Sequence, residues 1–217
     1  MSLFVWGRNS DGQCGDDIPS AKPANTIAMP RHIAMPAPVT AIACGTGQQG
    51  CTLAVVSGGA LFSFGNDAGG RLGHPRDASA THLTSNPTPR RVEALSSVRV
   101  RQVSCSDLHA LCLTDEGIVY SWGKQGRNGC LGRPVGPEQA LPAAVALPTP
   151  ACFVDCESGV SGAILADGSL RMWGTRAHTV HALATASLHS SHCGVCTVCG
   201  AGGAGMSMAD WGWARRT

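Results

Sequence analysis

Three cysteines toward the carboxyl-terminal end of the sequence have the spacing of metal ligands. Cys193, Cys196 and Cys199 form a C-x₂-C-x₂-C pattern in the segment HSSHCGVCTVCG, beside two histidines. Thiolates and imidazoles at this spacing can bind zinc or begin an iron–sulfur site. However, no cysteine follows Cys199 as a fourth ligand, and residues three apart on a strand point to opposite faces. We therefore interpret the segment as a degenerate or poorly ordered strand region and predict no metal and no cofactor.

The other residues that could support catalysis lack a catalytic setting. His109 precedes an apolar stretch, and we expect it to bond a neighbouring turn. Ser161 lies in Gly-Val-Ser-Gly, which lacks the Gly-x-Ser-x-Gly spacing of a nucleophile elbow. There is no Gly-x₄-Gly-Lys phosphate loop, and the glycine-rich turns follow strands without opening a helix. The sequence predicts no catalytic residues and no enzymatic chemistry of its own.

A cluster of arginines is the main charged feature of the chain. Segment 71–101 has six arginines and only two acidic residues: Arg71, Arg76, Arg90, Arg91, Arg99 and Arg101 against Asp77 and Glu93. Such a patch can meet an acidic protein surface or phosphate. No lysines or aromatics are interleaved with it, which favours a solvated loop and strand edge over nucleic-acid recognition. If a partner binds here, we expect Arg90 and Arg91 to lie nearest to it, because they end the long connection 74–91.

Composition limits the class of protein. The chain has 217 residues, a net charge of +2, 43% hydrophobic and 14% charged residues, which suits one large or two small folded domains. No apolar run is long enough for a membrane-spanning helix, and the first residues, MSLFVWGRNS, do not resemble a signal peptide. Eleven cysteines, mostly scattered singly, are best interpreted as reduced, buried side chains. We expect a cytoplasmic or nuclear protein.

An internal repeat is the strongest pattern in the sequence. An aromatic residue followed by glycine recurs at Trp6-Gly7, Phe64-Gly65, Trp122-Gly123 and Trp173-Gly174. A Gly-x-x-Gly segment follows each of the first three pairs, and a turn glycine with an apolar stretch before it precedes each of the last three. In the best-preserved unit we predict strands over 98–104, 109–114 and 118–122, joined by tight turns. Several short strands in a repeat of about 50 residues suggest the blades of a propeller.

The segment HALCLTDEGIVYSWGKQGRNGCLG, residues 109–132, resembles the repeat of the regulator of chromosome condensation family. Residues 3–15, 60–73 and 156–174 match parts of the same pattern. The resemblance implies an all-β fold, a β-propeller that most often has seven blades. A chain of 217 residues supplies about three to four of them, so we expect a partial propeller. Its expected units are a leading half-blade over 1–15, blades over 16–73, 74–132 (with a long loop 74–91) and 133–174, and a degenerate Cys/Gly-rich tail over 175–217.

What the resemblance implies about function is broad. The family includes exchange factors for Ran-type GTPases, chromatin-docking proteins, ubiquitin-ligase accessory domains and scaffolds. Our leading hypothesis is a non-enzymatic protein-interaction module that binds a protein partner, without direct reading of nucleic acid and without a membrane. Guanine-nucleotide exchange on a Ran-like GTPase is the alternative, and a truncated fragment without independent function is a third. The repeat tryptophans are expected to be core anchors.

Overall fold

The structure is a computed structural model that describes residues 2–15, 26–45, 50–75, 85–124, 129–134, 136 and 139–174. Within this part of the chain, regular structure consists of β-strands and two single-turn 3-10 helices. No helix in these residues is long and apolar enough to cross a membrane. The Cys/Gly-rich tail, with Cys193, Cys196 and Cys199, lies outside the described residues.

The strands form four antiparallel sheets that follow one another along the chain. The first sheet contains β1 (Leu3–Arg8) and β2 (Thr26–Ile33). The second contains β3 (Val39–Cys44), β4 (Cys51–Val56), β5 (Leu61–Asn66) and β6 (Ser85–Arg91). The third contains β7 (Val100–Cys105), β8 (His109–Thr114), β9 (Val119–Gly123) and β10 (Ala143–Ala144). The fourth contains β11 (Ala151–Glu157), β12 (Val160–Leu165) and β13 (Leu170–Gly174). The helices are η1 (Ala68–Gly70) and η2 (Glu93–Leu95).

Glycine turns set the length of these strands. Gly59, Gly117 and Gly168 each follow the middle strand of a sheet and have φ values of 82°, 81° and 82°. A residue with a Cβ is strained in this left-handed region, so glycine closes each hairpin at the same point in the repeat. The chain therefore reverses after about six residues, and each sheet stays narrow.

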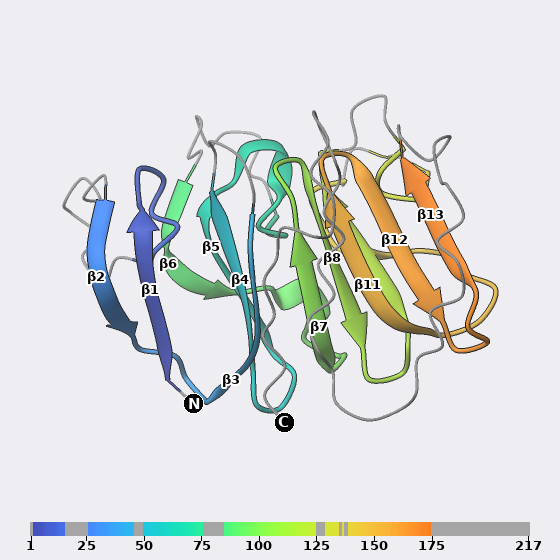
Figure 1. The fold of residues 1–217 in the computed structure, drawn as a ribbon, viewed down its shortest axis with the longest axis horizontal. Helices are drawn as coiled ribbons and strands as arrows, with labels where there is room; N and C mark the ends of the chain where they lie inside the picture. The colour runs from blue at the N-terminus through green and yellow to red at the C-terminus, as the bar shows by residue number, and fades with distance from the viewer. Residues whose placement is uncertain are drawn as a thin grey trace, which may run out of the picture.

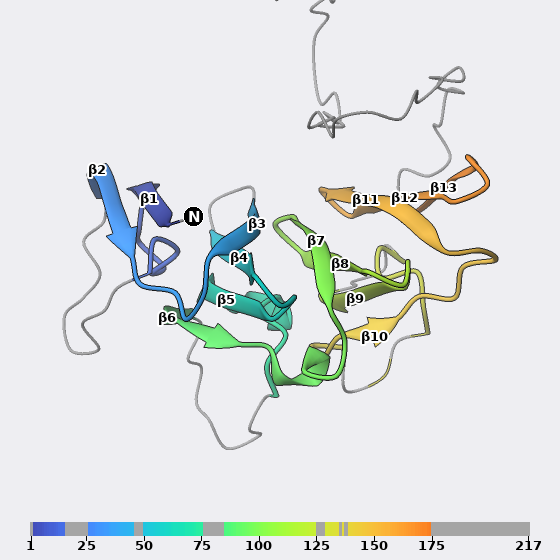
Figure 2. The ribbon, with the colours of Figure 1, turned by 90° about the horizontal axis from the view of Figure 1, so that it is seen from below.

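The sheets lie side by side as successive blades along an arc (Figures 1 and 2). The strands β3, β7 and β11 lie on the inner side of the arc, and β6 and β10 lie on its outer side (Figure 2). The innermost strands of neighbouring sheets contact each other, β3 with β7 and β7 with β11. This arrangement confirms the expected all-β, partial propeller.

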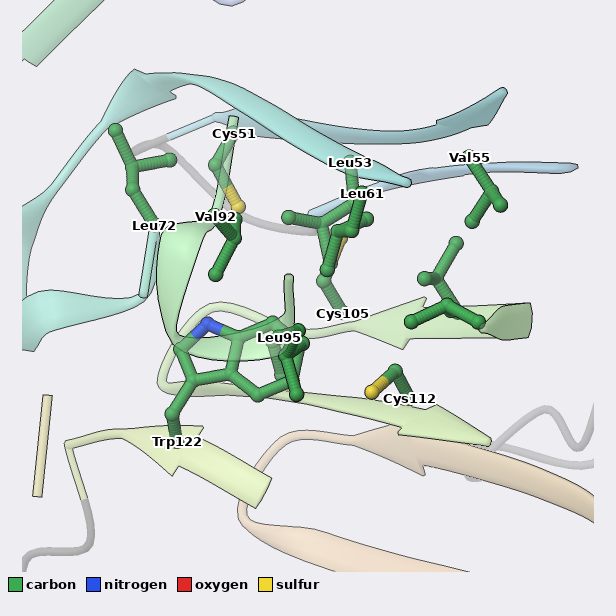
Figure 3. Close-up of a cluster of buried hydrophobic side chains, with 13 residues drawn as sticks. Cys51, Leu53, Val55, Leu61, Leu72, Val92, Leu95, Cys105, Cys112 and Trp122 are labelled. Carbon is green, nitrogen blue, oxygen red and sulfur yellow. The ribbon is translucent and has the colours of Figure 1, made fainter. Parts of the chain in front are cut away.

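The hydrophobic core is divided into three clusters, each between two neighbouring sheets. Side chains alternate between the two faces of a strand, so each blade contributes to the cluster before it and to the cluster after it. The cluster between the second and third sheets is drawn in Figure 3, where Trp122 from β9 lies beneath Leu95 and faces Leu53, Leu61 and Leu72. A single blade could not bury both of its faces, which is why stacking is required.

Each sheet ends one strand further along the chain than the predicted blade does. The strand that follows each glycine-rich loop joins the preceding sheet as its outer strand, as β2 does with β1 and β6 with β5. The leading half-blade therefore extends past residue 15 to Ile33. The prediction of a loop over 74–91 is wrong for its second half, because residues 85–91 form the strand β6. This strand was missed because Pro87 and Pro89 disfavour a central strand but are tolerated at a sheet edge.

Candidate functional site: the contacts between blades and the arginines of β6

Three of the repeat aromatics, Phe64, Trp122 and Trp173, insert against the glycine-rich loop of the preceding blade. The indole Nε1–H of Trp122 donates to the carbonyl oxygen of Arg71 at 2.8 Å. In the next blade Trp173 Nε1–H donates to the carbonyl of Cys130, also at 2.8 Å. Phe64, which has no donor, packs beside Gly15, where a Cβ would come within 3.3 Å of its ring. The Gly-x-x-Gly loop and the aromatic-Gly pair are thus the two halves of one contact between blades.

The glycine that follows the aromatic makes room for a neighbouring strand in the second, third and fourth sheets. At Gly123 an added Cβ would lie 2.8 Å from the Leu108 carbonyl oxygen and 2.9 Å from the His109 Cα. Gly65 is equally crowded by the Gly50 carbonyl oxygen, at 2.7 Å. At Gly7, by contrast, nothing lies within 4 Å of the Cβ position. Among the described residues, the first sheet therefore has no strand on the free side of β1, where the other sheets have one.

His109 lies in a buried polar network between the third and fourth sheets. His109 is completely buried. Its Nε2 lies 2.6 Å from Ser161 Oγ, and its Nδ1 lies 3.1 Å from Ser106 Oγ in the preceding turn. Ser161 donates its own hydroxyl proton to the Cys130 carbonyl at 2.7 Å, so Nε2 carries the imidazole proton and Ser161 accepts it.

This network is not a catalytic dyad. The Ser161 hydroxyl is committed to a backbone carbonyl, and both side chains are inaccessible to solvent. Burial lowers the pKa of His109 to about 4, so the ring is neutral at pH 7. The bond to Ser106 is the turn contact expected for His109. The bond to Ser161 was not predictable, because the two residues lie in different repeats.

The pKa is raised for most of the described cysteine thiols, whereas a hydrogen bond with Cys105 lowers the pKa of the buried Cys51. Eight are free thiols, of which Cys44 and Cys152 are exposed. Burial raises the pKa of Cys130 to about 11 and raises the pKa of Cys112 and of Cys156 further. No group of three or more His, Cys, Asp or Glu side chains in the described part of the chain could hold a metal ion. The six buried thiols fill small spaces in the core, as scattered free cysteines usually do.

The arginine-rich segment does not form one continuous basic patch. Arg71 is buried, and its Nε donates to the Ala68 carbonyl. Arg99 pairs with Asp115 at 3.2 Å. Arg101 donates to the carbonyls of Thr114 and Ala151, at 3.1 and 3.2 Å, and so ties the third sheet to the fourth. These three side chains have structural partners, which a charge count cannot reveal.

Arg90 and Arg91 remain exposed at the end of the outer strand β6. Arg91 makes a long ion pair with Glu93, at 4.0 Å, in which both side chains are largely solvated. Burial, together with the positive charge of Arg90, lowers the pKa of His74 to about 4. The basic feature at this edge is thus two consecutive arginines on a strand, whose side chains leave opposite faces of the sheet.

Comparison with known proteins identifies the family. Models of the "Regulator of chromosome condensation (RCC1) repeat" match residues 2–51 and 58–113, and a second model of the same repeat matches residues 100–130. Together they cover more than half of the chain. The chain belongs to the RCC1 repeat family of β-propellers.

Among relatives, the chain is 36% identical over 132 residues to the ultraviolet-B receptor UVR8 of Arabidopsis thaliana, covering 58% of this chain and 26% of the receptor. It is 32% identical over 178 residues to the mitochondrial RCC1 domain-containing protein RUG3 of the same plant, covering 79% of this chain and 38% of that protein. A solved structure of Prp20p from Saccharomyces cerevisiae, described with its binding to Gsp1p and histones, matches with a TM-score of 0.60 at 20% identity, covering 80% of this chain and 41% of that one. The chain thus spans between about a quarter and two fifths of the length of these proteins.

Proposed function

We propose that this protein is a non-enzymatic interaction module of the RCC1 repeat type, which binds an acidic protein surface through Arg90 and Arg91. The observation that carries the proposal is the position of these two side chains on β6. An outer strand is held by its sheet, so the charges are presented on a rigid support rather than on a loop. The other described arginines of the segment are engaged by internal partners.

The interior of the module supports an interaction role over a catalytic one. The polar side chains that could perform proton chemistry, His109 and Ser161, serve the contact between two blades. The cysteines of the described residues are free thiols, most of them buried, which suits a reducing compartment such as the cytoplasm or the nucleus.

The test is capture of partners from a lysate with the wild type and with the double variant Arg90→Glu, Arg91→Glu. We expect the variant to recover less partner, mainly because association is slower. Capture by the wild type should also fall as salt rises, because exposed charges are screened beyond about 8 Å at physiological ionic strength.

A matched control carries Lys124→Glu and Arg171→Glu, which changes the net charge equally at two exposed sites away from β6. Equal recovery by the wild type and the β6 variant contradicts the role of these arginines. Recovery that is insensitive to salt does the same. Loss in both double variants would show that net charge, rather than the β6 site, is responsible.

The second candidate function is guanine-nucleotide exchange on a Ran-like small GTPase. It is supported by the fold shared with Prp20p, whose structure is described with its binding to Gsp1p. The measurement is release of a fluorescent guanine nucleotide from a purified Ran-type GTPase in the presence of the chain. Nucleotide release at the uncatalysed rate would refute the exchange function, and the interaction module would remain as the proposed function.

A further inference from the structure

Two buried cysteines meet across the contact between the second and third sheets. Cys51 begins β4 and Cys105 ends β7. Both side chains belong to the core cluster between these sheets (Figure 3), and the two thiols form a hydrogen bond with each other. A Cβ added at Gly45 would lie 2.9 Å from the Cys51 sulfur and 3.1 Å from the carbonyl oxygen of Ser106, the residue after Cys105. The Cys51 sulfur therefore lies beside the end of β7.

The equivalent contact one blade further along agrees with this placement. His109 holds the position of Cys51, because each is paired with the glycine that follows the repeat aromatic. Cys156 holds the position of Cys105, near the end of the innermost strand of its sheet. The Cys156 sulfur lies 3.9 Å from the His109 carbonyl oxygen. Because a cysteine stands in place of this histidine one blade earlier, the contact between the second and third sheets brings two sulfurs together.

The surroundings of the pair make Cys51 the more nucleophilic of the two thiols. The hydrogen bond with Cys105 lowers the pKa of Cys51 against the effect of burial, and the positive charge of Arg71 lowers it further. The same hydrogen bond, together with burial, raises the pKa of Cys105, so Cys105 stays protonated as the donor. The thiolate is the reactive form of cysteine, and cationic neighbours are typical of reactive cysteines. Cys51 is therefore the sulfur that reacts first with an oxidant.

We propose that Cys51 and Cys105 form a reversible disulfide in response to hydrogen peroxide, which locks the second blade to the third. The Cys51 thiolate attacks one peroxide oxygen, so that an S–O bond forms, the O–O bond breaks and the sulfur is oxidised to a sulfenic acid. The hydroxide that leaves takes up the proton released by the Cys51 thiol. Cys105 then attacks the sulfenic sulfur: the S–S bond forms, the S–O bond breaks, and the oxygen leaves as water with the Cys105 proton. Two thiols and one peroxide thus give one disulfide and two molecules of water.

Burial of the pair limits the oxidants that can reach it to small ones. Cys51 is 1% exposed and Cys105 is 6% exposed, so peroxide enters when the contact between the blades opens locally. The disulfide would join two blades that are otherwise held by non-covalent packing, and cross-linking distant parts of a chain stabilises the fold by restricting the unfolded state. In a reducing compartment, disulfides of this kind are usually transient and redox-sensing. A small dithiol reverses the bond by thiol–disulfide exchange.

The experiment treats the reduced full chain with increasing concentrations of hydrogen peroxide and then blocks the remaining thiols with N-ethylmaleimide in denaturant. Mass spectrometry of the digested protein maps each cysteine. We expect Cys51 and Cys105 to lose alkylation together, in a cross-linked peptide that fragmentation assigns to these two residues, and dithiothreitol to restore both. The proposal is overturned if both stay alkylated at a peroxide concentration that oxidises the exposed Cys44 and Cys152, or if either is linked to another cysteine instead.

Two variants and a matched control test the order of the reaction. Cys51→Ala should leave Cys105 reduced, and Cys105→Ala should leave Cys51 without a cross-link. Cys112→Ala, at another buried cysteine of the same cluster, should cross-link as the wild type does. The peptide map of the wild type needs no variant, so it decides the proposal even if a variant fails to fold.

The urea midpoint of unfolding tests whether the disulfide locks the blades. Oxidation should raise the midpoint of the wild type by about 1–2 M and leave that of Cys51→Ala unchanged. An oxidised wild type no more stable than the reduced one, or oxidation of Cys105 in the Cys51→Ala chain, would each contradict the lock.

Discussion

Replacing Trp122 by alanine tests whether the repeat aromatic holds neighbouring blades together. The side chain is completely buried between the second and third sheets, and its indole donates to the Arg71 carbonyl at 2.8 Å. Truncating a buried tryptophan costs about 3–5 kcal/mol. The Arg71 carbonyl also loses the indole donor, which places the expected value toward the upper end of this range. Since whole domains are stable by only about 5–15 kcal/mol, the change should remove a large part of the free energy of unfolding.

Trp6 provides the matched control, because it occupies the same repeat position but is 62% exposed. In the single chain, Trp6→Ala should cost less than about 1 kcal/mol, as surface substitutions do. The assay is urea unfolding followed by far-ultraviolet circular dichroism. If Trp122→Ala and Trp6→Ala lower the unfolding midpoint equally, the assignment of Trp122 to a contact between blades is refuted.

Three further predictions follow from the same structure. Gly123→Ala should destabilise more than Gly7→Ala by about 1–3 kcal/mol, the usual cost of overpacking. Both glycines have φ near +110° but only Gly123 faces a neighbouring strand, so equal costs in urea unfolding would contradict this difference between the two positions. Stability should fall as the pH drops from 6.5 toward 4, because unfolded His109 is protonated there while buried His109, with its pKa near 4, stays neutral. At about 1.4 kcal/mol per pH unit the loss approaches roughly 3 kcal/mol, and a pH dependence unchanged by His109→Gln would contradict this assignment. Finally, the circular dichroism spectrum of the chain should be dominated by strand, and about one third helix, the average of globular proteins, would contradict the fold.

Much of the architecture could be predicted from local sequence patterns. The aromatic-Gly pairs, the turn glycines and the alternating apolar residues are short-range features, and they act on the backbone within a few residues. The predicted strands 98–104, 109–114 and 118–122 therefore agree with β7, β8 and β9 to within two residues. The anchor role of Trp122 could also be predicted from the repeat, and the structural role of His109 from the resemblance to the family.

Contacts between repeats were decided only by the tertiary structure. Arg101 reaches the carbonyl of Ala151, and His109 reaches Ser161, each across about fifty residues of sequence. Charge counting could not separate these buried or paired groups from Arg90 and Arg91, since pairing depends on which blades become neighbours. Trp6 and Trp122 hold equivalent positions in the sequence repeat, and the sequence does not show which of them has a neighbouring blade. The arc alone makes one of them a core residue and leaves the other exposed, because burial depends on whether a neighbouring blade is present.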